Sequence, residues 1–248
     1  RIAGATGDGL PALEVPEPDL SEHPWPAMPE RRDFDEPDLP REFQWLRTPK
    51  PERIMSLTAR PGWLRLTGRE SLGSWFEQAL VARRQEAFAY RAETKLEFAP
   101  NNFQQMAGLV SYYNAHKYHY CFVTVDESGT RYVSIMSCEG DPSTDTTFPL
   151  NSGHAGEFRV EERYRLPADG AVWLRADVDD AALRFSWSLD GENWNLLPFV
   201  LDQSLISDEA GRGEHGSFTG AFVGICCQDL SGQACPADFD YFDYIERD

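Results

Sequence analysis

The sequence predicts an all-β fold, a two-sheet jelly-roll sandwich that follows a proline-rich amino-terminal linker. Short runs of alternating apolar and polar residues recur along most of the chain, and glycine, proline, asparagine and aspartate separate them. No long amphipathic helix interrupts the series. Many short strands at this spacing are typical of sandwiches and barrels. The 248 residues, of which 41% are hydrophobic, suffice for one large β domain with a sizeable core.

The first 30 residues differ in composition from the rest of the chain. Prolines at positions 16, 18, 24 and 26 block regular helix and sheet and favour extended backbone. Trp25 stands between two of these prolines, and its large apolar surface favours packing against a neighbouring surface. We therefore expect a linker over residues 1–30 and the sandwich over residues 31–248.

The predicted strands show period-two alternation or are rich in β-branched and aromatic residues. The dipeptide Asp190-Gly191 and the segment Asp126–Gly129 have the composition of tight turns between strands. Only residues 201–209 suggest a short helix. The predicted strands are residues 63–67, 88–98, 106–113, 118–125, 132–136, 172–178, 183–189, 218–227 and 239–245.

The charge balance argues against several classes of partner. The formal net charge is −18, with 41 acidic and 23 basic residues, so the chain lacks the basic face that binds nucleic acid or anionic membranes. No apolar run approaches the roughly 20 residues of a transmembrane helix. No signal peptide is recognisable, so we expect a cytoplasmic protein without nucleic-acid or membrane partners. The chain begins at Arg1 instead of Met, which suggests a piece of a longer protein. A homo-oligomer is left open.

The five cysteines do not suggest a metal site. Their number is odd and no pair has the spacing of metal ligands, so free, buried thiols in a reducing compartment are the expected state. They are Cys121, Cys138, Cys226, Cys227 and Cys235.

The sequence contains no complete catalytic site that we recognise. The G-x-S-x-G and H-E-x-x-H motifs, a glycine-rich phosphate loop and a strand with E-x-D-x-E spacing are all missing. Glu93 and Glu97 share a face of the strand predicted over residues 88–98, opposite its apolar residues. A solvated strand face is the preferred interpretation of these two acids. We therefore expect no catalytic residues in this chain.

Acidic residues near both ends of the predicted sandwich suggest a calcium site. Asp33 and Asp35 lie near its start, and Asp240 lies in the last predicted strand. The first and last strands of a jelly roll commonly pair, and carboxylates brought together there need protons or a cation. Ca²⁺ prefers such oxygen ligands, so we predict structural Ca²⁺ at these three residues. The alternative is that they are exposed acids at strand ends.

Several motifs resemble the carboxy-terminal, concanavalin A-like sandwich domain of bacterial β-xylosidases in glycoside hydrolase family 43, and they occur in the same order as in that family. The similarity extends from about Arg31 to Tyr244. The motifs are Asp33–Asp35, Arg60–Leu66, Gly68–Leu72, Gln104–Leu109, Phe218–Gly224 and Pro236–Phe242.

The resemblance implies an enzyme that releases xylose from the ends of xylo-oligosaccharides with inversion, and it allows α-L-arabinofuranosidase side activity. The catalytic carboxylates would lie on a five-bladed propeller, whose end would fall within residues 1–30. The sandwich would pack on that propeller. By motif, Phe218 would help to close the substrate pocket.

The sequence departs from the family pattern at two positions. Ser217 stands where a second phenylalanine is common, which weakens the expected contact with the pocket. Arg32 stands where an acid is common, which weakens the calcium hypothesis. The loop over residues 141–156 is longer than is usual in the family, and we assign it no role.

Two other functions compete with that of an accessory domain. An independent carbohydrate-binding module would present a row of exposed aromatic residues, for which Tyr112, Tyr118 and Tyr120 are the candidates. A sandwich hydrolase with its own acids is disfavoured by the missing acid triad. For Phe218, the alternative to a pocket role is an ordinary core position at a strand start.

Overall fold

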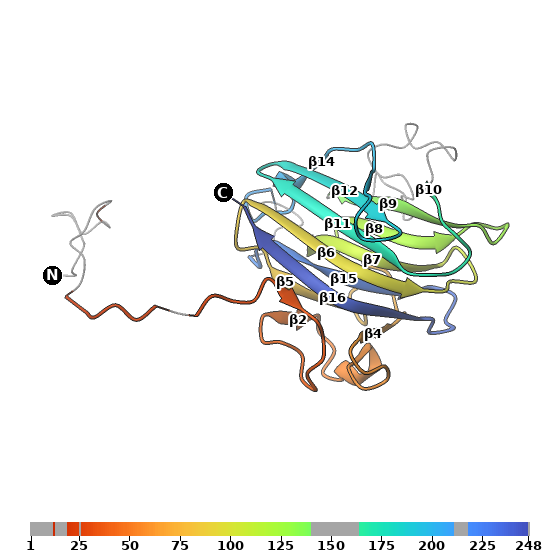
Figure 1. Cartoon of the computed structure of the whole chain (residues 1–248), viewed down its shortest axis with the longest axis horizontal. Coiled ribbons are helices and arrows are strands. Elements are labelled where there is room, and N and C mark those ends of the chain that lie inside the picture. Colours follow the sequence, from red (N-terminus) through yellow and green to blue (C-terminus); the bar gives the residue numbers. More distant parts are fainter. Residues whose placement is uncertain (1–11, 13–18, 25, 140–163, 211–217, 248) are drawn as a thin grey trace.

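The computed structural model describes residues 12, 19–24, 26–139, 164–210 and 218–247. In this part of the chain, two antiparallel sheets are stacked face to face (Figure 1). The predicted all-β sandwich is therefore confirmed. None of the helices in the described residues is long and apolar enough to cross a membrane.

The larger sheet has nine strands. Its main path runs in the order β13 (Asn195–Leu196), β12 (Ala182–Ser188), β11 (Val172–Asp179), β6 (Ala89–Phe98), β16 (Pro236–Glu246), β4 (Leu64–Thr67) and β3 (Met55–Ser56). Two short strands join it at the side, since β1 (Arg31–Arg32) pairs with β16 and β14 (Leu201–Asp202) pairs with β12.

The smaller sheet has seven strands. Their order is β10 (Tyr164–Arg165), β9 (Arg131–Glu139), β8 (Lys117–Val125), β7 (Gln105–Asn114), β15 (Phe222–Asp229), β5 (Ala79–Arg84) and β2 (Phe43–Trp45). Two short 3₁₀ helices, η1 (Pro51–Arg53) and η3 (Gln203–Leu205), lie in connecting segments.

Each of the nine predicted strands overlaps a strand of the structure. The prediction missed β5, whose sequence Ala-Leu-Val-Ala-Arg-Arg has no alternation because its first five residues are all buried. Strand β15 begins at Phe222, four residues later than predicted. The helix predicted over residues 201–209 is wrong in type, since the segment contains β14 and the 3₁₀ helix η3.

Apolar side chains fill the space between the two sheets. Leu96, Phe185, Ile225 and Phe239 are among the residues with no exposed surface there. A second apolar cluster covers the opposite face of the seven-stranded sheet and includes Tyr120, Phe122 and Met106. Leu72, from the segment between β4 and β5, packs into this second cluster. The seven-stranded sheet is therefore buried on both faces, which explains why β8 is buried along its whole length.

The five cysteines are thiols outside any disulfide, as the odd number and spacing predicted, and four of them are buried. Burial raises the pKa of the Cys226 thiol well above its ordinary value. It raises the pKa of the half-buried Cys235 to about 11. The raised pKa values favour the protonated form of these two thiols at neutral pH.

The outer face of the nine-stranded sheet carries a ladder of ion pairs. Asp238 on β16 lies opposite Arg65 on β4, and two hydrogen bonds of 2.6 and 2.7 Å join them. Arg60 donates a third bond to Asp238 at 3.1 Å. Burial raises the pKa of Asp238, but the two guanidinium groups outweigh it and hold that pKa below its ordinary value.

Glu93 corrects the prediction of a solvated strand face. Glu93 is only 9% exposed, because β6 lies between β11 and β16 in the middle of the sheet. Its carboxylate accepts hydrogen bonds from Arg175 at 2.7 and 2.9 Å and from the Tyr241 hydroxyl at 2.6 Å. Glu97, on the same strand, has a side chain that is 42% exposed and pairs with Arg60.

Residues 19–24, before β1, are exposed, and Figure 1 shows them running away from the sandwich. Leu20 is 79% exposed and Met28 is 46% exposed. Trp25 lies outside the described residues, so its predicted packing and the boundary at residue 30 stay predictions.

Replacing Asp238 by asparagine is expected to lower the free energy of unfolding by about 1.5–3 kcal/mol at neutral pH, the value of hydrogen bonds to charged groups. Because the pKa of Asp238 is depressed in the folded state, its contribution is present above the unfolded pKa near ~3.9 and is lost as the pH falls through the folded pKa. Urea unfolding from pH 7 to pH 2 should therefore show a shallower acid loss for Asp238→Asn than for the parent. Glu97→Gln, which removes the more exposed partner of Arg60, is the control and should change stability by less than about 1 kcal/mol.

Candidate docking face and the Phe218 segment

Phe218 is almost fully solvent-exposed. It lies four residues before β15, and 99% of its surface is accessible. The alternative that Phe218 is an ordinary core residue is therefore wrong. An isolated phenylalanine ring in water leaves a large apolar area unburied, so its surroundings are the first place to look for a binding function.

A mainly apolar hollow of about 190 Å³ lies beside the Phe218 segment. Four strands of the seven-stranded sheet contribute to it, namely β2, β5, β7 and β15. Thr219, the residue after Phe218, lines this hollow and so places Phe218 near its rim. The apolar and aromatic side chains of the lining are Trp45, Leu46, Leu80, Ala82, Tyr112, Tyr113 and Phe222.

Trp45 in the lining of the hollow is exposed, and two further exposed aromatic residues lie in the segment between β4 and β5. Trp45 is 38% exposed, Trp75 is 57% exposed and Phe76 is 75% exposed. The Arg47 guanidinium lies 5.4 Å from the centre of the Trp75 ring. Its positive charge also favours the ionised form of the Tyr112 hydroxyl in the hollow. We call Trp45, Trp75, Phe76, Phe218 and the hollow the docking face.

The tyrosines proposed for a carbohydrate-binding module are not exposed. Tyr112, Tyr118 and Tyr120 do share one face of the seven-stranded sheet, but they are 2%, 5% and 0% exposed. Tyr112 and Tyr118 stack on each other with their ring centres 6.4 Å apart. Burial raises the pKa of the Tyr112 hydroxyl to about 12. These three rings therefore belong to the second apolar cluster and form no row of exposed aromatics.

The three acids of the calcium hypothesis lie in different surroundings. Strands β1 and β16 do pair, as expected for first and last strands, and Arg31 lies opposite Asp243. Asp240, however, accepts a hydrogen bond of 2.7 Å from Lys95. Asp33 lies near Arg31 and Asp243, whereas Asp35 lies against Gly62. Among the described residues, no group of three or more acidic, histidine or cysteine side chains could hold a metal ion. The arrangement gives no support to the calcium hypothesis, which stays a prediction.

The motif Asp33-Phe34-Asp35 has a structural explanation in its middle residue. Phe34 is 4% exposed and its ring centre lies 5.9 Å from that of Phe43, which in turn contacts Phe242 on β16 at 5.4 Å. Phe34 thus anchors the start of the sandwich to its last strand, and the two acids flank that anchor.

Sequence reasoning missed most of the docking face. Trp75 and Phe76 lie in a polar turn between predicted strands, where no alternation draws attention to them. Trp45 belongs to a strand of only three residues, which is too short for a periodic signal. The signal that could have found them is the placement of large aromatic residues among turn residues, where no core position explains them.

Comparison with known proteins agrees with the sandwich fold. A family model described as the beta xylosidase C-terminal concanavalin A-like domain matches residues 31–245. A xylosidase/arabinosidase 43B from Humicola insolens is 45% identical over 218 residues, which are 87% of this chain and 38% of that protein. A beta-xylosidase from Bacillus subtilis is 40% identical over 237 residues, which are 95% of this chain and 42% of that protein.

A solved structure gives the same result. The crystal structure of xylan beta-1,4-xylosidase from Bacillus halodurans C-125 matches with a TM-score of 0.84 and 38% identity, over 98% of this chain and 45% of that one. The chain spans about two fifths of the length of the two curated relatives. The family match covers most of the chain, and it agrees with the two stacked antiparallel sheets. The chain therefore belongs to the family of C-terminal concanavalin A-like domains of beta-xylosidases in glycoside hydrolase family 43.

Proposed function

We propose that this chain is the accessory domain of a β-xylosidase that releases xylose from the ends of xylo-oligosaccharides with inversion, using carboxylates on a five-bladed propeller domain. The family membership supports this proposal, and so does the lack of a recognisable catalytic motif in the sequence. One relative is named as a xylosidase/arabinosidase, which is in keeping with α-L-arabinofuranosidase side activity.

In this proposal, the docking face holds the propeller. It combines exposed aromatic rings with an apolar hollow, and exposed apolar surface commonly marks an interaction site. Burying apolar surface stabilises an interface by about 25 cal/mol per Å², so several aromatic residues supply a useful part of the association energy. The hollow is of a size to receive one or two side chains from the partner domain.

The exposed Phe218 ring carries the second part of the proposal, in which it forms one wall of the substrate pocket. Pockets for small ligands are lined mainly by apolar and aromatic side chains, and a flat ring fits the apolar face of a sugar. A ring that is 99% exposed is available for such a contact without any rearrangement of the core.

An independent carbohydrate-binding module is the other candidate, and no observation favours it, because its three candidate tyrosines are buried. Turnover of xylo-oligosaccharide by this chain alone would contradict both the accessory domain and the carbohydrate-binding module. Binding of xylan by this chain, without any association with a propeller domain, would favour the module.

Introducing a charge on the docking face is expected to weaken domain association. In the two-domain enzyme, Trp45→Glu should lower the melting temperature or separate the unfolding of the two domains, because a carboxylate would be buried in an apolar contact. Differential scanning calorimetry measures both effects. Leu196→Glu is the matched control, since Leu196 is 57% exposed and lies on the edge strand of the other sheet. Equal behaviour of the two variants would contradict the assigned face.

Truncating Phe218 is expected to impair turnover without unfolding the domain. Loss of an aromatic wall should lower kcat/KM on xylobiose about 10- to 100-fold. This corresponds to about 1.5–3 kcal/mol, which is typical of one buried apolar side chain. The melting temperature should be unchanged, because the ring makes no core contact. Phe88→Ala, at a ring that is 80% exposed elsewhere, is the control. Unchanged kinetics for Phe218→Ala would rule out the pocket role.

A chelator titration tests the calcium hypothesis. Because Lys95 already neutralises Asp240 with a 2.7 Å hydrogen bond, we expect the same melting temperature in EDTA and in millimolar Ca²⁺. A different result would instead support a site at Asp33, Asp35 and Asp240. The melting temperature of the parent would fall in EDTA and recover with Ca²⁺, and that of Asp240→Asn would not respond to either.

A further inference from the structure

The direction of the Phe218 ring depends on the main chain that carries it. At 99% exposure the ring packs against almost nothing in its own chain. A side chain without such packing is free to change rotamer, and its placement is only as precise as its backbone. A residue that closes a pocket needs a defined position, so the backbone after Phe218 is where fixation is needed.

The peptide group between Thr219 and Gly220 is held at both ends by side chains. Its N–H, on Gly220, donates to Asp208 Oδ1 at 3.2 Å. Its carbonyl, on Thr219, accepts a hydrogen bond from the Arg84 guanidinium. The two side chains come from opposite directions in the sequence, one from the end of β5 and one from the segment after η3. Together they fix the plane of this peptide group, which is the second after Phe218.

Additional contacts fix the two side chains themselves. Tyr113 on β7 donates its hydroxyl to the same Asp208 Oδ1 at 2.9 Å. The Arg84 guanidinium lies 4.9 Å from the centre of the Phe222 ring. Asp208 therefore joins Gly220 to the neighbouring strand, and Arg84 is oriented by an aromatic ring at the start of β15.

Gly220 is suited to this clamp for two reasons. Its φ of +71° lies in the left-handed region, which favours glycine. A Cβ atom at this position would lie 3.1 Å from Arg84 Nη1, which is closer than an ordinary contact. The glycine thus lets the chain turn tightly while Arg84 approaches the Thr219 carbonyl.

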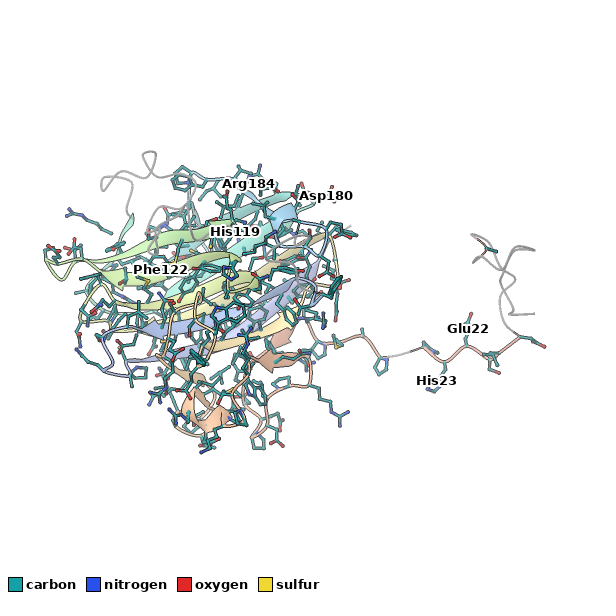
Figure 2. The ribbon with its side chains drawn as sticks, turned by 180° about the vertical axis from the view of Figure 1, so that it is seen from behind. Glu22, His23, His119, Phe122, Asp180 and Arg184 are labelled. Carbon is teal, nitrogen blue, oxygen red and sulfur yellow. The ribbon has the colours of Figure 1, made fainter. Side chains whose placement is uncertain are left out.

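The segment that carries Asp208 is tied to the sandwich by buried hydrogen bonds. His119 on β8, labelled in Figure 2, lies with Nε2 3.1 Å from the Asp202 carbonyl and Nδ1 2.6 Å from Ser137 Oγ. Because a carbonyl can only accept, Nε2 donates to Asp202, and Nδ1 is hydrogen-bonded to the serine hydroxyl. Asp202 belongs to β14 of the other sheet, so this histidine connects the two sheets.

Gln203 strengthens the same connection. Its side-chain amide exchanges hydrogen bonds with Ser111 on β7 at 2.9 and 3.1 Å and donates to Gln85 at 3.1 Å. Ile206, three residues later, is 2% exposed. Asp208 therefore projects from a segment that is fixed in the core on its amino-terminal side.

We propose that Asp208 and Arg84 are positioning residues that aim Phe218 by fixing the Thr219–Gly220 peptide group. The proposal rests on the proposed function of Phe218 as a wall of the substrate pocket. Neither residue needs to touch the sugar. Asp208 is the stronger half of the clamp, because it is partly buried and joins two donors, whereas Arg84 is exposed.

The test compares five variants of the two-domain enzyme with xylobiose as substrate. Asp208→Ala removes the acceptor and should lower kcat/KM about tenfold, the value of one hydrogen bond to a charged group. Asp208→Asn keeps an acceptor oxygen and should recover most of that loss. The double variant Phe218→Ala with Asp208→Ala should be no slower than Phe218→Ala alone. Asp190→Ala is the matched control, because its carboxylate accepts backbone N–H bonds in a turn beside β13 on the other sheet.

A second measurement separates the clamp from the pocket role. Hydrogen exchange of the Gly220 amide should be faster in Asp208→Ala than in the parent, and equal in Asp190→Ala. Full additivity of the losses in kcat/KM caused by Phe218→Ala and Asp208→Ala would overturn the proposal. So would an Asp208→Ala variant that behaves like the Asp190→Ala control. If Phe218→Ala itself leaves the kinetics unchanged, the pocket role fails. The exchange rate then decides alone whether Asp208 holds the peptide group, and an unchanged rate would refute the clamp as well.

Discussion

Burial on both faces of the seven-stranded sheet is the constraint on which the rest of the structure depends. One face packs on the other sheet, and the opposite face carries a second apolar cluster that includes Tyr120 and Phe122. Apolar surface of that extent has to be covered, and Leu72 and Leu46 pack against it from the segments that flank β5 and β2. These covering segments also carry Trp75 and Trp45. The docking face is therefore a consequence of how the second cluster is closed.

The same constraint explains how far the sequence could predict the fold. Strands with one apolar and one polar face, such as β6, show clear alternation and were located within one residue at each end. Strand β5 is buried on both faces, so its alternation is lost and the prediction passed over it. Glu93 shows the opposite error. Alternation correctly placed it on the outer face of β6, but the pattern of one strand does not reveal that Arg175 and Tyr241 on neighbouring strands cover that face.

The candidate site was harder to predict, because its contacts join residues that are distant in sequence. Phe218 was singled out only through resemblance to a family, and its exposure could not be read from its neighbours. Arg84 lies 135 residues from Thr219, and Asp208 lies 12 residues from Gly220. Hydrogen bonds between a side chain and a backbone group place no demand on the type of residue that supplies the backbone group, so they leave no pairwise pattern in a single sequence. Gly220 is the one position where backbone geometry leaves a sequence signal.

The proposed function comprises two tasks that place different demands on the structure. Association with a neighbour needs apolar area, which is non-directional and tolerates small shifts, and the aromatic rings around the hollow supply it. Shaping a pocket needs direction, because a misplacement of about 1 Å can cost a large factor in rate. Hydrogen bonds are directional. They tie residues 202 and 203 to His119 and Ser111 in the core, and five residues further along the same segment Asp208 accepts a bond from the Gly220 amide. A ring that is exposed in the isolated domain can thus be held in one place by the fold behind it.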